Sequence, residues 1–177
     1  MIHKTAIIDS KAKVSSSAKI GAYSVIGPNV EVGDDVIIHS QVNISGNTKI
    51  GNGNKIYPFA SIGNDPQDLK FNNEETSLVI GDNNIIREYC TFNRGTGHSQ
   101  KTIIGSNCLF MAYVHIAHDC IIKDNVILAN GVQLGGHSEI HYHAIVGGMT
   151  PVHQFCKVGQ HSFIGGGRVI LQEVFWR

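Results

Sequence analysis

Isoleucine and valine recur at every sixth position along the first third of the chain. The series starts at Ile2, contains only these two residue types over eleven positions, and ends at Ile62. Aliphatic or aromatic residues continue the same spacing over 80–92 and again over 104–170. A period of six fits neither a 3.6-residue helix nor a seven-residue coiled coil. It fits short strands joined by tight turns.

Two other positions within the six-residue repeat also indicate strands. Four positions after each aliphatic residue lies a small or medium residue, as at Ala6 and Ala12, and one position after it lies glycine in eleven repeats, as at Gly21 and Gly135. Because six is even, the aliphatic residue points to the same side in every strand. We expect the glycines to supply turn conformations that a side chain would oppose.

Six-residue repeats of this kind are a known signature of β-helices. In such folds three strands close one triangular coil, so residues 18 apart stack at the strand spacing of about 4.8 Å. The repeat therefore predicts an all-β, left-handed parallel β-helix of about eight to nine triangular coils. A β-sandwich is the alternative, but its turns recur every 8–12 residues without a fixed phase.

The repeat is interrupted twice, and both interruptions are polar and rich in turn residues. We expect two loops that leave the prism, over about 64–79 and 93–103. Loops on a rigid scaffold often carry binding residues. The first loop groups Gln67, Asp68 and Lys70, although a solvated loop without a task is the alternative.

Composition narrows the class of protein. With 177 residues, of which 42% are apolar, the chain predicts a single β-helix domain over 1–177. Only 16% of the residues are charged, below the usual quarter, which favours a surface partly covered by partner subunits. The net charge is zero and no basic run occurs, so nucleic acid and anionic membrane are poor partners. The chain has no apolar stretch of spanning length and starts without a secretory signal, so we expect a cytoplasmic protein with no transmembrane segment.

The cysteines fall at the small inward position of the repeat, which predicts buried, reduced thiols. They are Cys90, Cys108, Cys120 and Cys156. They form neither a disulfide framework nor a zinc-binding CxxC pair. Trimeric β-helices such as the gamma-type carbonic anhydrases bind zinc with two histidines five residues apart. None of the ten histidines has that spacing, so we expect no metal.

Seven of the ten histidines lie between His115 and His161. Stacking by 18 residues places His118 beside Gly136 and His137, with His153 one coil further on. This cluster suggests an acid–base site, since the ordinary pKa of imidazole lies near 6.5. Solvated histidines at turn positions are the alternative.

Five stretches carry a more specific resemblance. In order along the chain they are ASIGNDPQDLKF, NRGT, HIAHDC, GGH and GGMTPVHQFC. Over residues 2 to about 170 the chain resembles the UDP-N-acetylglucosamine O-acyltransferases, hexapeptide-repeat enzymes that start lipid A biosynthesis. The resemblance implies transfer of a 3-hydroxyacyl chain from acyl carrier protein to the glucosamine 3-hydroxyl of UDP-N-acetylglucosamine. It also implies a homotrimer with sites between subunits, without a metal or other cofactor.

The resemblance assigns catalytic roles to three positions. His118 would be the general base that takes the proton from the sugar hydroxyl. Asp119 would orient it, which requires a turn, because adjacent strand residues point to opposite faces. The N–H of Gly136 would stabilise the tetrahedral oxyanion.

The resemblance also implies substrate contacts. Four residues would contact the sugar nucleotide or the acyl group: His115, His137, His153 and Gln154. Gln67, Asp68 and Lys70 would reach the sugar from the first loop. Gly166 matches the position that limits acyl length in the family.

Two departures from the family pattern leave other functions open. The family continues into a C-terminal helical domain that helps bind the nucleotide and the carrier protein, and we expect this domain to be absent here. Asn93 stands where the family usually has histidine before the RGT turn. The alternatives are a shortened, inactive or binding-only trimer and another hexapeptide acyl- or acetyltransferase.

Overall fold

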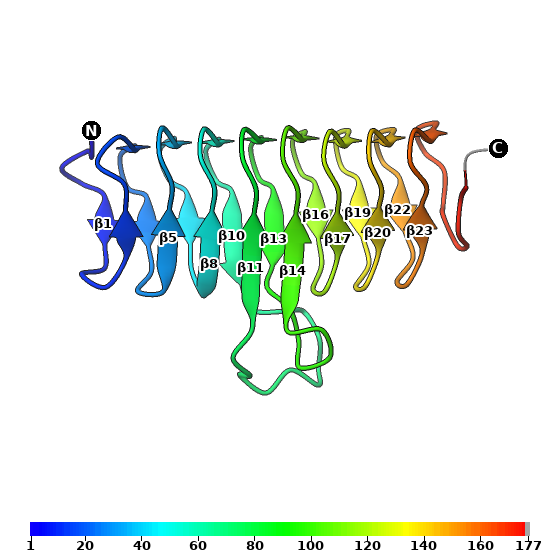
Figure 1. Cartoon of the computed structure of the whole chain (residues 1–177), viewed down its shortest axis with the longest axis horizontal. Coiled ribbons are helices and arrows are strands. Elements are labelled where there is room, and N and C mark those ends of the chain that lie inside the picture. The colour runs from blue at the N-terminus through cyan, green and yellow to red at the C-terminus, as the bar shows by residue number, and fades with distance from the viewer. Residues whose placement is uncertain (176–177) are drawn as a thin grey trace.

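The computed structural model describes residues 1–175, which form a long three-sided prism (Figure 1). Every strand in this range pairs with parallel neighbours, and strands follow one another through three sheets in turn. One coil therefore takes one strand from each sheet, and each sheet has eight strands over residues 1–175. This confirms the predicted left-handed parallel β-helix and its coil number.

The three sheets are numbered in the order in which the chain enters them. The first sheet contains β1 (Ile7–Ile8), β4 (Val25–Ile26), β7 (Asn43–Ile44), β10 (Ser61–Asn64), β13 (Thr91–Asn93), β16 (His115–Ile116), β19 (Gln133–Leu134) and β22 (Pro151–Val152). The second sheet contains β2 (Lys13–Val14), β5 (Val30–Val32), β8 (Asn47–Ile50), β11 (Ser77–Ile80), β14 (Lys101–Ile104), β17 (Ile121–Ile122), β20 (Glu139–Ile140) and β23 (Lys157–Val158). The third sheet contains β3 (Lys19–Ile20), β6 (Ile37–Ile38), β9 (Lys55–Ile56), β12 (Ile85–Ile86), β15 (Leu109–Phe110), β18 (Ile127–Leu128), β21 (Ile145–Val146) and β24 (Phe163–Ile164).

The sixth-position residues form the core, stacked in register from coil to coil. In the first sheet Ile62 pairs with Phe92, and Phe92 pairs with Ile116. Phe92 also packs edge-to-face against Phe110 of the third sheet, with ring centroids 5.1 Å apart. All four side chains are fully buried, and burial of one such side chain typically contributes about 1.5–3 kcal/mol. The core is thus continuous along the axis of the prism.

Most of the repeated glycines do not have the role expected from the sequence, although Gly63 (φ 78°) does adopt a left-handed backbone. The left-handed backbone conformation occurs two residues later, at non-glycine residues such as Tyr23 (φ 58°) and Asn125 (φ 60°). At several of these positions, Gly21 among them, the glycine directly after the core residue is needed for space instead. A Cβ on Gly21 would lie 2.6 Å from the carbonyl carbon of His39 in the next coil, which is far inside van der Waals contact.

Both extruded loops are shorter than predicted. They span 65–76 and 94–100, because the strands that flank them, β10, β11, β13 and β14, have three or four residues, whereas most strands have two. Ser77 pairs in register with Asn47 on one side and Lys101 on the other. Backbone pairing therefore continues through polar residues that carry no hydrophobic signal. The two loops leave the same side of the prism together (Figure 1).

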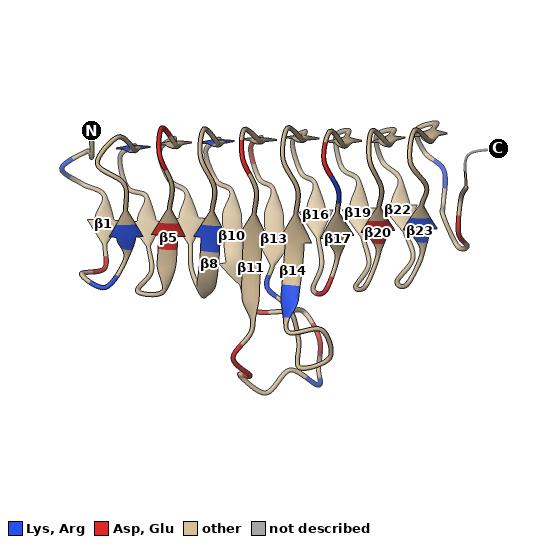
Figure 2. Ribbon diagram, in the orientation of Figure 1, with Lys and Arg blue, Asp and Glu red and all other residues tan. Residues whose placement is uncertain are grey.

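Charged residues are sparse and most of the paired ones lie on the second sheet (Figure 2). Lys13 and Lys49 flank Glu31 at 2.8 and 3.3 Å, and Lys157 lies 3.0 Å from Glu139. Such exposed pairs contribute about 0–1 kcal/mol each. Within residues 1–175 the structure has no helix long and apolar enough to cross a membrane.

The four cysteines are buried and unpaired, as the repeat predicts. Burial raises the pKa of the Cys90 and Cys120 thiols to about 12. These thiols are therefore protonated at neutral pH and behave as small apolar side chains.

Candidate active site

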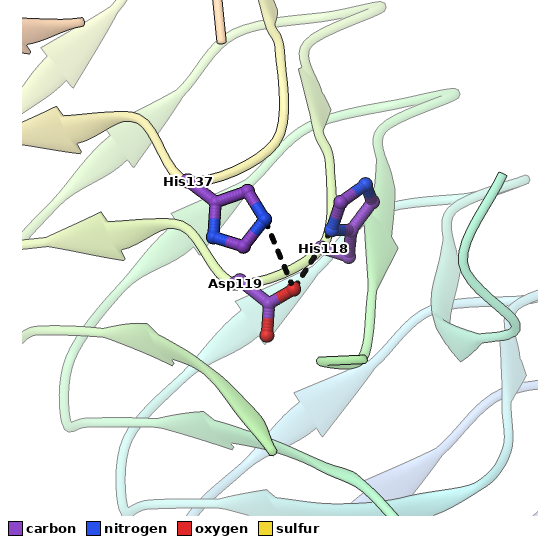
Figure 3. Close-up of side chains that lie close together, drawn as sticks. All are labelled: His118, Asp119 and His137. Carbon is purple, nitrogen blue, oxygen red and sulfur yellow. Dashed lines mark hydrogen bonds and ion pairs between the residues drawn. The ribbon is translucent and has the colours of Figure 1, made fainter. Parts of the chain in front are cut away.

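His118 and Asp119 lie in the turn between β16 and β17, where the first sheet meets the second. We call this edge of the prism the first corner. Asp119 has a φ of 60°, and this left-handed residue turns its side chain back toward its neighbour. The Nδ1–H of His118 donates to Oδ2 of Asp119 over 2.8 Å (Figure 3). The turn that this contact requires is therefore present, and Nε2 of His118 is left free to accept a proton.

Asp119 is held by the second loop as well as by His118. Its side chain is fully buried. The backbone N–H and the hydroxyl of Thr96 donate to its two oxygens over 3.0 and 2.6 Å. Burial raises the pKa of the Asp119 carboxyl, but the hydrogen bonds from His118 and Thr96 outweigh burial and hold that pKa below its usual range. The carboxylate is therefore ionised at neutral pH.

His137 lies one coil beyond Asp119, at the same position of the turn. Its Nε2 is 3.7 Å from Oδ2 of Asp119, and its ring meets the ring of His118 edge-on at 5.2 Å. The opposite face of His137 stacks on Phe155 of the following coil at 4.4 Å. Burial lowers the pKa of His137, so the neutral imidazole predominates at neutral pH and can both donate and accept a hydrogen bond.

Gly136 stacks directly on His118. A Cβ at this position would lie 2.5 Å from Cε1 and 2.7 Å from Nε2 of His118, so a side chain here would displace the imidazole. The N–H of Gly136 has no acceptor among residues 1–175. A free donor next to the free imidazole nitrogen is the arrangement that a developing oxyanion requires.

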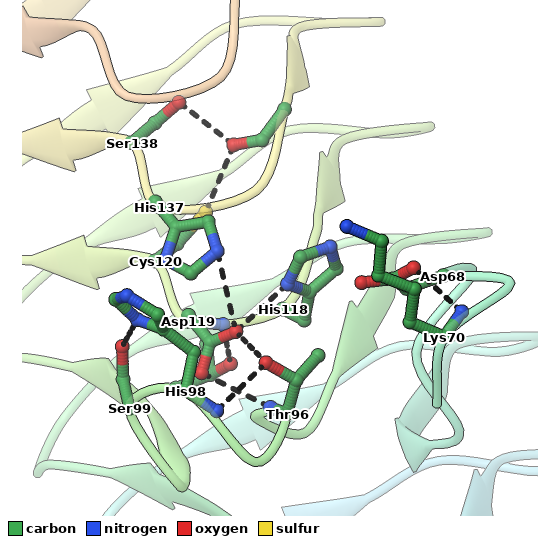
Figure 4. Close-up of polar contacts among 12 residues, drawn as sticks. Asp68, Lys70, Thr96, His98, Ser99, His118, Asp119, Cys120, His137 and Ser138 are labelled. Carbon is green, nitrogen blue, oxygen red and sulfur yellow. Dashed lines mark hydrogen bonds and ion pairs between the residues drawn. The ribbon is translucent and has the colours of Figure 1, made fainter. Parts of the chain in front are cut away.

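A groove of about 810 Å³ runs along the first corner between the coils and the loops. Six of the residues that line it were expected in the site from the sequence: Gln67, Asp68, Lys70, His118, His137 and Gln154. Figure 4 shows Asp68 and Lys70 on the loop at one side of the groove, facing His118. The backbone N–H of Lys70 donates to Oδ1 of Asp68 over 2.9 Å, which closes a tight turn in the loop.

Three other expected residues lie outside this groove. His115 is on β16, where its Nδ1 is 2.7 Å from the hydroxyl of Thr91, and burial lowers its pKa. His153 is exposed and its Nδ1 donates to the carbonyl of Gln154 over 3.1 Å. Both side chains flank the first corner on the first-sheet side. Gly166 follows β24 and lies at a different corner, between the third sheet and the first.

Two residues of the second loop join the site without having been singled out from the sequence. Thr96 binds Asp119, as described above, and the ring of His98 meets His137 edge-on with centroids 4.8 Å apart. His98 also lines the groove. The NRGT motif preceding a histidine was the available signal, but the loop lies outside the six-residue register, so stacking arithmetic could not place it.

The arrangement is suited to general base catalysis. A buried, ionised carboxylate fixes one imidazole nitrogen, and His118 lines a groove of the size typical of small-molecule sites. Ligand atoms of His118, Asp119 and His137 also lie within 4.8 Å of one another, which fits a metal ion. However, Oδ2 of Asp119 already accepts hydrogen bonds from His118 and Thr96, which favours the acid–base role.

The fold and this site together define a hexapeptide-repeat transferase. Residues 101–136 match the family model described as "Bacterial transferase hexapeptide (six repeats)". The acyl-(acyl-carrier-protein)–UDP-N-acetylglucosamine O-acyltransferases of Aliarcobacter butzleri and Herminiimonas arsenicoxydans are 55% and 50% identical to the chain. Each alignment covers 98% of this chain and 67% of the relative.

Solved structures give the same relationship. LpxA from Acinetobacter baumannii superposes with a TM-score of 0.97 at 50% identity, over 98% of this chain and 67% of that one. The UDP-N-acetylglucosamine acyltransferase of Campylobacter jejuni superposes with a TM-score of 0.94 at 38% identity, over 98% and 68%. The chain belongs to the UDP-N-acetylglucosamine O-acyltransferase family, and it spans about two thirds of the length of these relatives.

Proposed function

We propose that this chain transfers a 3-hydroxyacyl group from acyl carrier protein to the glucosamine 3-hydroxyl of UDP-N-acetylglucosamine, the first step of lipid A biosynthesis. The observation that carries the proposal is the His118–Asp119 pair facing a groove whose other wall bears Gln67, Asp68 and Lys70. Family membership supplies the identity of the two substrates.

In the proposed reaction His118 acts as general base. Its Nε2 takes the proton of the sugar 3-hydroxyl while that oxygen attacks the thioester carbonyl carbon. The N–H of Gly136 stabilises the oxyanion of the tetrahedral intermediate. The carbon–sulfur bond then breaks, and the proton passes from His118 to the departing thiolate of the carrier. Asp119 stabilises the imidazolium that exists between the two proton transfers.

The remaining expected residues bind substrate in this proposal. Asp68 and Lys70, together with Gln67, hold the sugar from the loop side of the groove. His137 and Gln154 contact the sugar nucleotide or the acyl group from the coil side. His115 and His153 extend this contact surface along the first sheet.

We also propose a homotrimer, with the third sheet facing a neighbouring copy. Its outward positions form a continuous apolar row across the stacked coils: Ile85, Leu109, Ile127, Ile145 and Phe163. Phe163 is 75% exposed in the single chain. Gly166, two residues beyond β24, continues this surface, so it would set the acyl length in the site of a neighbour. The family resemblance, together with four reduced cysteines, supports a cytoplasmic location.

The assignment is tested with purified protein, 3-hydroxyacyl carrier protein and UDP-N-acetylglucosamine. Replacing the base in His118→Ala is expected to lower kcat by about 10²–10⁴-fold. His161→Ala is the control, because His161 stacks on His143 at the corner between the second and third sheets and should leave the rate unchanged. Equal turnover by wild type and His118→Ala would disprove the role of His118. Tight binding of the sugar nucleotide without turnover by the wild type would favour the binding-only alternative, and acetyl transfer to a small acceptor would favour a different hexapeptide enzyme.

A further inference from the structure

The second loop contacts both halves of the groove through residues that lie two positions apart. Arg94 and Thr96 belong to the NRGT sequence directly after β13. The side chain of Arg94 contacts the first loop. The side chain of Thr96 contacts Asp119 in the turn that bears the base (Figure 4). This division suggests that each residue positions a different group.

Arg94 contacts both ends and the middle of the first loop. Its Nη2 lies 2.8 Å from Oδ1 of Asp65, where the loop leaves β10. Its Nε donates to the hydroxyl of Thr76 over 3.2 Å, where the loop returns to β11. Its guanidinium lies over the ring of Phe71, 5.0 Å from the centroid. Residues 67–70 are therefore enclosed between points that a single side chain fixes.

The burial of Arg94 shows that these contacts are more than surface pairing. Its side chain is only 14% exposed, although that of Asp65 is 64% exposed. An ion pair with so exposed a partner contributes little by itself. The planar guanidinium makes three contacts in three directions, which the single ammonium of lysine cannot reproduce. Asn93 adds to the same end of the loop, because its Nδ2 donates to the carbonyl of Asp65 over 2.9 Å.

Thr96 contacts the other half of the site. Its backbone N–H donates to Oδ1 of Asp119, and its hydroxyl donates to Oδ2, the oxygen that also accepts from His118. Hydrogen bonds from two sides fix the plane of a carboxylate and, through it, the ring of His118. Asp119 is fully buried, so no water can replace the Thr96 hydroxyl without a rearrangement.

We propose that Arg94 and Thr96 are positioning residues with separate effects. Arg94 sets the loop that binds the acceptor sugar nucleotide, and Thr96 sets the carboxylate that orients the base. This inference rests on the proposed acyltransfer function. Neither side chain touches the reacting atoms, so each acts through the residues that it holds.

For Arg94 the expected effect is on acceptor binding. Arg94→Met keeps the apolar stem but loses the ion pair and the hydrogen bond. We expect KM for UDP-N-acetylglucosamine to rise about tenfold or more, with kcat changed by less than about threefold. Arg94→Lys should reverse only part of the rise in KM, because lysine keeps the positive charge but lacks the planar guanidinium that makes several contacts at once. Arg87→Met is the matched control, since Arg87 pairs with Glu88 and lies over Tyr57 at another corner.

For Thr96 the expected effect is on the chemical step. Thr96→Val keeps the shape and removes the hydroxyl, and we expect kcat to fall about tenfold or more with KM changed by less than about threefold. The hydrogen bond from Thr96 helps to lower the pKa of Asp119, so this pKa should rise in the variant, which an NMR titration of the Asp119 carboxyl measures. Thr96→Ser should restore both values. Thr150→Val is the matched control, because Thr150 is buried and its hydroxyl donates to the carbonyl of Gly148 in its own turn.

The possible results of these assays distinguish a failure of this inference from a failure of the proposed function. If the wild type turns over and both variants show equal changes in kcat and KM, or none, the division of roles is wrong. If the wild type does not turn over, the proposed function fails. The inference is then judged by hydrogen exchange of residues 65–76, which Arg94→Met should accelerate and Thr96→Val should not. Circular dichroism and Tm of each variant show whether the prism is intact.

Discussion

At the scale of single residues, the corner positions with left-handed backbone carry much of the chemistry. Asp119, His137 and Phe155 occupy this position in three successive coils, with φ between 60° and 65°. Aspartate and histidine tolerate this conformation better than most side chains do. The same turn directs each side chain along the edge of the prism, toward the next coil. A position that the fold requires for its corner thus brings acid–base groups into contact.

Two histidines make stability depend on pH at this edge. Burial lowers the pKa of His115 and of His137, so the unfolded chain binds protons more readily than the folded one as pH falls below about 6.5. The stabilising contribution of the neutral rings is present above that pH and is lost as pH falls through the lowered values. We therefore expect Tm to decrease between about pH 7 and pH 5.

The pH dependence of Tm is measured by thermal unfolding of the wild type and of His115→Gln between about pH 7 and pH 5. The variant should lose less Tm than wild type on acidification, whereas His161→Gln should follow wild type. Asp119, whose pKa is also lowered, acts in a separate window, because its contribution is lost only below about pH 4. Parallel curves for wild type and His115→Gln would contradict the assignment.

At the scale of elements, buried asparagines connect the coils that carry the two loops. Asn54 and Asn84 stack at the corner between the second and third sheets and are fully buried. The N–H of Asn84 donates to Oδ1 of Asn54 over 2.9 Å, and the N–H of Cys108 donates to Oδ1 of Asn84 over 2.8 Å. Each asparagine also donates to carbonyls of its own coil and the next, as Asn84 does to Gly105. This ladder continues the hydrogen bonding through turns that cannot pair as strands.

Removal of one rung of this ladder should destabilise the prism. Asn84→Ala leaves backbone groups of two coils without partners, and each buried unsatisfied group costs about 1–3 kcal/mol. We expect the free energy of unfolding to decrease by about 2–4 kcal/mol. Denaturant unfolding measures the change, with Asn43→Ala on the exposed face of the first sheet as control. A change below about 0.5 kcal/mol, as for an ordinary surface substitution, would show that the ladder is not structural.

The strands and the loops differ in how much of their structure can be predicted from the sequence. The six-residue period predicts the strands, the inward residues and the position of the cysteines, because a closed coil allows one register. The same register is sufficient to predict that His118, Gly136 and His137 lie together at one corner. The role of most repeated glycines was predicted wrongly, since Gly63 has the expected left-handed backbone but residues as different as Tyr23 and Met149 adopt it in other turns. The partners of Thr96 and Arg94 lie across loops that have no register, so the pattern could not identify them.

At the scale of the whole molecule, each coil contacts only the coils next to it, so the three sheets present long outer faces to other molecules. The outward row on the third sheet is the apolar candidate, and Ile127 lies at its centre, paired with Leu109 and Ile145. If the proposed trimer forms through this row, Ile127→Lys should convert it to smaller species without unfolding the chain, because the side chain points away from the core. Light scattering after gel filtration measures the mass. Val79→Lys, on the outer face of the second sheet, should leave it unchanged, and an unchanged mass for Ile127→Lys would place the interface elsewhere.

The 18-residue stacking also determines how such a chain can change in length during evolution. Duplication of one whole coil, such as 123–140, would lengthen the prism by about 4.8 Å and leave every later side chain on its original face. Deletion of a single residue from the same coil would instead turn every later core residue toward solvent. The coils can therefore gain or lose residues only in whole turns of 18, whereas the loops at 65–76 and 94–100 can gain or lose single residues. New specificity should accordingly arise by insertion at the loops, beside the groove that they already border.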